Sequence, residues 1–92
     1  MRLRWSSDAR LDLREAAQFI ATDNPRAAEE VENRILAAAD RLLEYPNSGR
    51  IGLRGGTREL VIKRTPYLLV YRVSASVIEI VRVWHTSREP FS

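Results

Sequence analysis

The sequence predicts a single α+β domain over residues 1–92, with an N-terminal strand, an antiparallel helix hairpin and then a three-stranded antiparallel meander. Three observations lead to this fold class. Apolar residues recur at helical spacing in the first half of the chain. In the second half they form strand-like runs, and turn residues separate these runs. A chain of this length buries one core. We therefore expect the helices to pack on one face of the sheet and the other face to stay partly open.

A short strand opens the chain, because Leu3 and Trp5 alternate with two arginines. Ser7 and Asp8 then supply a capping oxygen and an acid, which favour the start of a helix. The apolar stripe of this helix has spacings of four, three and four, and further apolar residues widen it. The stripe consists of Ala9, Leu13, Ala16 and Ile20, widened by Leu11, Ala17 and Phe19.

A second helix follows after a short joint. Asn24 suits the N-cap, and Pro25 suits the first helical position. The predicted core positions of this helix repeat the same spacing at Val31, Ile35, Ala38 and Leu42. Tyr45 precedes Pro46, which disfavours helical backbone and ends the element. The short joint predicts that the two helices form an antiparallel hairpin.

Three strand-like runs complete the domain, near residues 58–64, 67–73 and 77–85. Pairing Arg64 with Tyr67 and Val73 with Val77 fixes which residues share a face. The face predicted to carry the helices holds Leu60, Ile62, Tyr67, Leu69, Tyr71, Val73, Val77, Val81 and Val83. The opposite face holds Glu59, Val61, Lys63, Leu68, Val70, Arg72, Ile78, Ile80, Arg82 and Trp84.

On that opposite face, Lys63 and Arg82 are predicted to flank Leu68. With Arg72 and Trp84 they form a basic groove that suits a phosphate backbone or an acidic amphipathic helix. Structural roles remain open for the same residues. The arginines can be solvated, with Glu59 neutralising Arg72 across the strands, and Trp84 can be a packing residue. Arg88 is a flexible surface charge unless the tail folds back onto the domain.

The charge balance is modest at +3, but 14 of the 15 basic residues are arginine, because Lys63 is the only lysine. Arginine grips phosphate and carboxylate in a bidentate manner, so nucleic acid or an acidic protein is a plausible partner. A GC-rich genome would explain the same bias.

The sequence contains no cysteine, no signal-peptide pattern and no apolar run of the roughly 20 residues that span a bilayer, so we expect a cytoplasmic protein without a membrane partner.

The chemistry available to this chain is narrow. One histidine and no cysteine exclude the usual zinc sites, and neither a phosphate-binding glycine loop nor a serine elbow is present. We therefore expect no metal and no cofactor. Cations and one imidazole suit metal-free RNA cleavage, in which arginines stabilise the phosphorane and His85 transfers a proton.

Residues 56–60, 66–73 and 78–88, in this order, resemble the RelE/ParE superfamily of toxins from bacterial toxin-antitoxin modules. Supporting motifs are Asp12-Leu13 in the first helix, Tyr71-Arg72 near the end of the penultimate strand, and a His-x-x-Arg motif after the last strand. The similarity covers nearly the whole chain. It implies a small toxin that forms a hetero-oligomer with a cognate antitoxin, which masks the toxin's working surface.

The superfamily has two branches. ParE-like toxins inhibit DNA gyrase, whereas RelE-like toxins cut mRNA on the ribosome and commonly use an aromatic residue in the tail. If the protein is a ribonuclease, Arg82, His85 and Lys63 are the candidate catalytic residues. The RelE resemblance places Arg82, Lys63 and Arg72 on matching sheet positions and Phe91 at the tail position, where phenylalanine cannot transfer a proton. We therefore favour gyrase, with mRNA cleavage and a non-toxic antitoxin-binding module as alternatives. The residues expected to bind the antitoxin or the target are Arg58, Lys63, Arg72, Arg82, Trp84 and Arg88.

Overall fold

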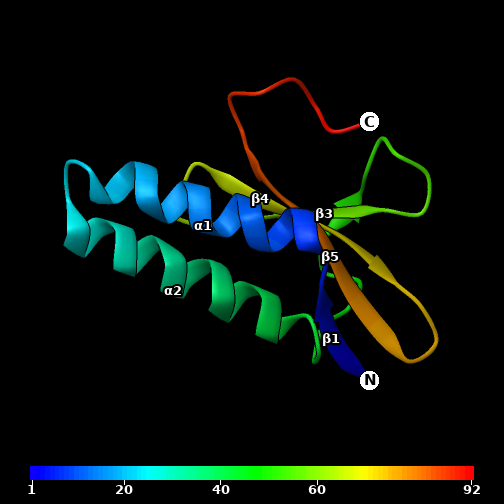
Figure 1. Ribbon diagram of the computed structural model, residues 1–92. Coiled ribbons are helices and arrows are strands. Elements are labelled where there is room, and N and C mark those ends of the chain that lie inside the picture. The colour runs from blue at the N-terminus through cyan, green and yellow to red at the C-terminus, as the bar shows by residue number, and fades with distance from the viewer.

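The computed structural model describes residues 1–92 and has two antiparallel helices packed against a five-stranded mixed sheet (Figure 1). The elements are β1 (Arg2–Trp5), α1 (Ser7–Ala21), α2 (Pro25–Arg41), β2 (Arg50–Ile51), β3 (Arg58–Val61), β4 (Tyr67–Val73) and β5 (Val77–His85). The strand order is β1-β5-β4-β3-β2, and β1 runs parallel to β5 while the other pairs are antiparallel. The predicted fold class is confirmed. Neither helix has the length and apolar character needed to cross a membrane.

Side-chain caps fix where both helices begin. The Ala9 N–H donates to Ser6 Oγ at 2.9 Å, so Ser6, one residue before the predicted Ser7, caps α1. The Ala27 N–H donates to Asn24 Oδ1 at 3.1 Å, and Pro25 follows at the first helical position, as predicted. These caps satisfy N–H groups that have no partner inside the helix.

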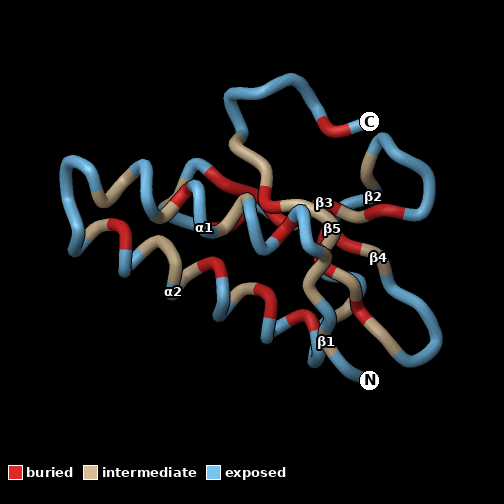
Figure 2. Tube along the Cα trace, viewed as in Figure 1, coloured by how far each residue is buried: buried red, intermediate tan, exposed pale blue.

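The main core lies between the helices and the sheet. Figure 2 shows buried residues recurring along α2, on the side that packs inward. The predicted helical stripes are largely confirmed, but Leu11 and Phe19 are 49% and 79% exposed and do not belong to the core. The buried cluster consists of Ala9, Ala16, Ile35, Ala39, Leu42, Ile62, Tyr67, Leu69, Tyr71, Ile78, Ile80 and Val83.

The predicted register of the last strand was wrong by one residue. Val73 pairs with Ile78, not with Val77, because Ser74 and Val77 face each other across the turn at residues 75–76, where the Ser74 N–H donates to the Val77 carbonyl at 2.9 Å. A bulge then lies opposite Val70 and Tyr71, where Val81 is the extra residue. Ile78 and Ile80 consequently face the helices, while Val81 packs on the other side of the sheet.

The face of the sheet away from the helices, here called the outer face, is partly covered by the C-terminal tail. Phe91 is buried against Leu68 and Val70 in a small second cluster, which Val81 and Trp84 extend. The Trp84 indole N–H donates to the Glu89 carbonyl at 2.9 Å, and its ring meets the Phe91 ring edge-on at 5.1 Å. The tail therefore covers part of the surface that the sequence predicted to be open.

Candidate functional site

Arg82 is held by an acid on α1. Its Nε and Nη2 atoms donate to the Asp12 carboxylate at 2.7 and 2.9 Å, and the Val83 N–H donates to the same group at 3.0 Å. β1 pairs with β5 only as far as Ile80, so Asp12 takes over where strand pairing ends. The hydrogen bond to Asp12 raises the pKa of Arg82. Arg82 is therefore held in its charged form, which can stabilise an anion but does not act as a general acid.

Lys63 lies on a different surface from Arg82, and the predicted groove with both cations flanking Leu68 was wrong. β3 ends at Val61, and the Ile62 N–H donates to the Tyr67 carbonyl at 3.0 Å. The turn therefore closes between Ile62 and Tyr67, where pairing of Arg64 with Tyr67 was predicted. Arg64 has a φ of 65° within this turn, and Lys63 points to the side where α2 meets β3.

His85 pairs with Tyr67 at the end of β5. The two rings meet edge-on with centroids 5.2 Å apart, and burial raises the pKa of the Tyr67 phenol. The His85 Nδ1 atom accepts the Ser87 N–H at 3.1 Å and lies 2.7 Å from Ser87 Oγ. Tyr67 belongs to the helix-facing core, so His85 is directed away from the outer face. The three predicted nuclease residues are therefore not brought together.

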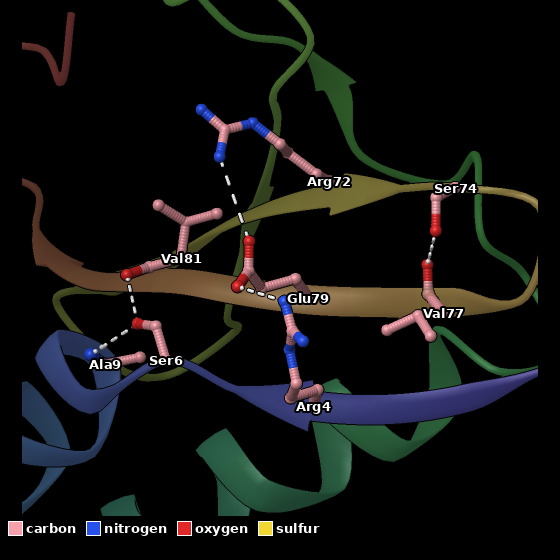
Figure 3. A network of polar contacts seen from close by, with 8 residues as sticks. All are labelled: Arg4, Ser6, Ala9, Arg72, Ser74, Val77, Glu79 and Val81. Carbon is pink, nitrogen blue, oxygen red and sulfur yellow. Dashed lines mark hydrogen bonds and ion pairs between the residues drawn. The ribbon is translucent and has the colours of Figure 1, made fainter.

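Arg72 lies on the outer face, but its partner is not the predicted Glu59. Figure 3 shows Glu79 between Arg72 and Arg4, with ion-pair distances of 3.8 and 3.0 Å. Glu79 lies directly opposite Arg72 in the β4–β5 ladder, which explains the choice. Glu59 instead accepts two hydrogen bonds from Arg50, at 3.0 and 3.2 Å.

The remaining predicted binding residues also make internal contacts. Arg58 donates to the Gly49 carbonyl at 2.8 Å and so ties down the loop before β2. The guanidinium groups of Arg88 and Arg82 lie 3.8 and 5.1 Å from the centre of the Trp84 ring. Because the tail folds back, Arg88 is stacked on the indole and is no longer a free surface charge.

A hollow with a volume of about 570 Å³ lies between α2 and β3. We call it the α2–β3 groove. Three cations and no acid line it, around an apolar floor. Its residues are Arg34, Ala37, Ala38, Arg41, Tyr45, Ser48, Leu60, Val61, Ile62 and Lys63. Sequence reasoning missed Arg34 and Arg41, although their spacing of seven around Ala37-Ala38 places them on one side of a helix.

The α2–β3 groove also borders a free strand edge. β2 pairs with β3 only through Arg58 and Glu59, so Leu60 and Val61 have no neighbouring strand on that side. Val61 is exposed there. An unpaired edge can accept an added strand, and alternating apolar and basic side chains beside it can select the strand's sequence. This combination suits an acidic peptide segment.

A smaller cavity of about 280 Å³ lies under the tail, bordered by Glu59, Trp84 and Phe91 among other residues. Arg50 neutralises the buried Glu59 carboxylate in this cavity. No group of three or more His, Asp or Glu side chains is arranged to hold a metal ion. The α2–β3 groove, which is larger than this cavity and is lined by three cations and no acid, is the better candidate for binding.

Comparison with known proteins gives concordant matches. A family model described as the ParE toxin of the type II toxin-antitoxin system parDE matches residues 3–90. The chain is 44% identical over 88 residues to a Sinorhizobium fredii protein described as a candidate toxin, Y4kP, covering 96% of this chain and 91% of that one. It is 37% identical over 84 residues to toxin RelE2 of Caulobacter vibrioides, with coverage of 91% and 93%.

A solved structure shares the architecture closely. A chain from the chromosomal ParDE toxin-antitoxin system of P. aeruginosa superimposes with a TM-score of 0.84 at 25% identity, covering 92% of this chain and 95% of that one.

Proposed function

Since the chain belongs to the ParE toxin family of type II toxin-antitoxin systems, we propose that it arrests growth by inhibiting DNA gyrase in the cytoplasm until a cognate antitoxin neutralises it. It is a toxin-family protein of the RelE/ParE superfamily. Ribosome-dependent mRNA cleavage is the second candidate, because the Caulobacter relatives are named RelE toxins.

The observation that carries the gyrase proposal is the separation of the three groups a metal-free nuclease would need. General acid–base catalysis requires the acid, the base and the anion-stabilising cation to reach one phosphate together. Here Arg82 is engaged by Asp12, Lys63 lines the α2–β3 groove, and His85 contacts Tyr67 in the helix-facing layer. The buried Phe91 supplies no proton either. This arrangement favours action through protein binding.

His85→Ala and Lys63→Ala are expected to arrest growth as strongly as the wild type when induced without antitoxin. Neither side chain contributes to a shared reaction centre, so no transition-state stabilisation is lost. Colony counts after induction measure the effect, and primer extension on abundant mRNAs reports any cleavage. Codon-phased cuts that disappear in His85→Ala, together with a loss of growth arrest, would support the nuclease candidate instead.

We propose further that the antitoxin inserts an acidic, partly apolar segment into the α2–β3 groove. Arg34, Arg41 and Lys63 supply positive charge around an apolar floor, and the edge at Val61 offers backbone groups for strand addition. Arg34 is already paired with Glu30 at 3.0 Å, so Arg41 and Lys63 are the cations left to meet the antitoxin.

The double charge reversal Arg41→Glu/Lys63→Glu is expected to keep toxicity while weakening antitoxin binding about a hundredfold or more, because two attractive contacts become repulsive. Isothermal titration calorimetry with the cognate antitoxin measures the affinity, and co-expression measures protection. Arg10→Glu/Arg14→Glu on the exposed side of α1 is the matched control, with the same change in net charge. Equal weakening in both variants would indicate a long-range charge effect and contradict the groove assignment.

A further inference from the structure

The end of β2 and the loop that follows it expose two large apolar side chains. Ile51 is 80% exposed and Leu53 is 70% exposed. Figure 1 shows this loop projecting beyond the sheet near the C-terminal tail. The loop is mostly exposed (Figure 2), with Gly52 half-buried, and the chain is buried again at Thr57. We call residues 50–54 the hairpin tip. Neither apolar side chain contributes to either hydrophobic cluster.

Backbone hydrogen bonds hold the hairpin tip in one shape. The Gly52 N–H donates to the Thr57 carbonyl at 2.9 Å, and the Thr57 N–H and Oγ1 both donate to the Arg54 carbonyl, at 3.1 and 2.6 Å. Gly56 has a φ of 79°, which the tight return of the chain requires. The two apolar side chains are thus presented on an ordered turn, and a partner that binds them pays little of the entropy of ordering a loop.

The segment that contains the hairpin tip carries charge of one sign only. No acidic residue occurs from Asn47 to Arg58, whereas Arg50, Arg54 and Arg58 do. Arg50 is neutralised by Glu59. Arg58 donates to the Gly49 carbonyl, which is uncharged, so the positive charge of Arg58 is not neutralised by this contact. Arg54 lies over the Phe91 ring at 5.3 Å and is exposed, so it adds a second positive charge beside the two apolar side chains.

We infer that the hairpin tip inserts Ile51 and Leu53 into an apolar, acidic-rimmed depression on the toxin's target protein, with Arg54 meeting the acidic rim. This inference rests on the proposed function and names the contact through which the toxin acts. The α2–β3 groove includes no residue of the hairpin tip, so substitutions in the tip leave the groove proposed for the antitoxin intact. Aliphatic side chains provide no stacking surface for bases, which disfavours a nucleic-acid partner.

The double variant Ile51→Ser/Leu53→Ser tests this inference. It is expected to need about a hundredfold more protein for half-maximal inhibition of purified gyrase, since each apolar anchor contributes about tenfold to affinity. Both side chains are exposed, so the thermal melt should match that of the wild type. Leu11→Ser/Phe19→Ser, which changes two exposed apolar residues of α1, is the matched control and should inhibit like the wild type.

A second variant, Arg54→Glu, tests the charge in the same assay. It should weaken gyrase inhibition about tenfold and reverse the salt dependence, because attraction to an acidic rim becomes repulsion. Antitoxin affinity should stay within twofold of the wild type in both hairpin variants.

Three outcomes would overturn the inference: a double variant that inhibits like the wild type, a control that loses as much, or an equal loss of antitoxin affinity. If wild-type protein leaves gyrase active, the gyrase proposal fails separately, and growth arrest then decides the hairpin inference. Arrest retained by the double variant overturns it. If the double variant no longer arrests growth but still binds ribosomes in co-sedimentation, a protein target is supported. If the double variant also loses ribosome binding, the hairpin inference is overturned.

Discussion

Asp12→Ala is expected to lower the free energy of unfolding by about 2–4 kcal/mol. The substitution removes the acceptor for two Arg82 donors and for the Val83 N–H, all in a partly buried position where water replaces it poorly. It also removes the group that takes over where β1 ceases to pair with β5. Urea unfolding, monitored by circular dichroism, measures the change. The slope of the unfolding free energy against urea concentration should stay the same as in the wild type.

The double variant Asp12→Ala/Arg82→Met provides the control for this prediction. Removing both charges leaves no uncompensated guanidinium, so part of the stability should return. Because the hydrogen bond to Asp12 raises the pKa of Arg82, the charged guanidinium stabilises the fold below the ordinary arginine pKa while Asp12 is ionised, and this contribution is lost as the pH rises through the raised pKa. Asp12→Ala with wild-type stability would show that the Asp12–Arg82 pair is not structural.

Tyr71→Phe is expected to cost about 2–4 kcal/mol of unfolding free energy. The Tyr71 hydroxyl is fully buried, donates to the Pro46 carbonyl at 2.8 Å and accepts the Gly49 N–H at 2.9 Å. Phenylalanine leaves both backbone groups unsatisfied in the interior. Thermal and urea unfolding measure the loss, and hydrogen exchange should show faster exchange at Gly49.

Tyr45→Phe is the matched control, because Tyr45 is 56% exposed and its change should stay within about 0.5 kcal/mol. Gly49→Ala tests the contact between Gly49 and the Tyr71 hydroxyl by changing the glycine. An added Cβ would lie 2.7 Å from the Tyr71 hydroxyl oxygen and 2.9 Å from the Glu59 carbonyl oxygen, so it should destabilise at least as much as Tyr71→Phe. Equal stability of Tyr71→Phe and Tyr45→Phe would contradict this account of the loop.

The sequence was sufficient for the helices because local rules dominate there. Asn24 and Pro25 mark the start of α2 by capping chemistry, and the four-three-four spacing identifies the buried side of each helix. Phe19 was misassigned because a wider apolar stripe does not reveal how far the sheet extends beneath a helix. The fold class followed from the order of these elements.

The candidate site was harder to predict because it depends on contacts between distant residues. One residue of error in the 74–77 turn, followed by the bulge at Val81, moved Ile78 and Ile80 to the opposite face. The contact between Asp12 and Arg82 spans 70 residues, so no local pattern predicts it, and only a family resemblance singles out Asp12. The burial of Phe91 under a folded tail has no periodic signal in the sequence.

Gyrase supercoiling and in vitro translation, assayed in parallel with the same preparation of antitoxin-free protein, test the central claim most directly. We expect supercoiling of relaxed plasmid to be inhibited at protein concentrations that leave translation and mRNA intact. Addition of the cognate antitoxin should restore supercoiling. Arrested translation with cut mRNA and active gyrase would contradict the central claim and establish a ribosome-dependent nuclease, and no effect in either assay would identify a non-toxic antitoxin-binding module.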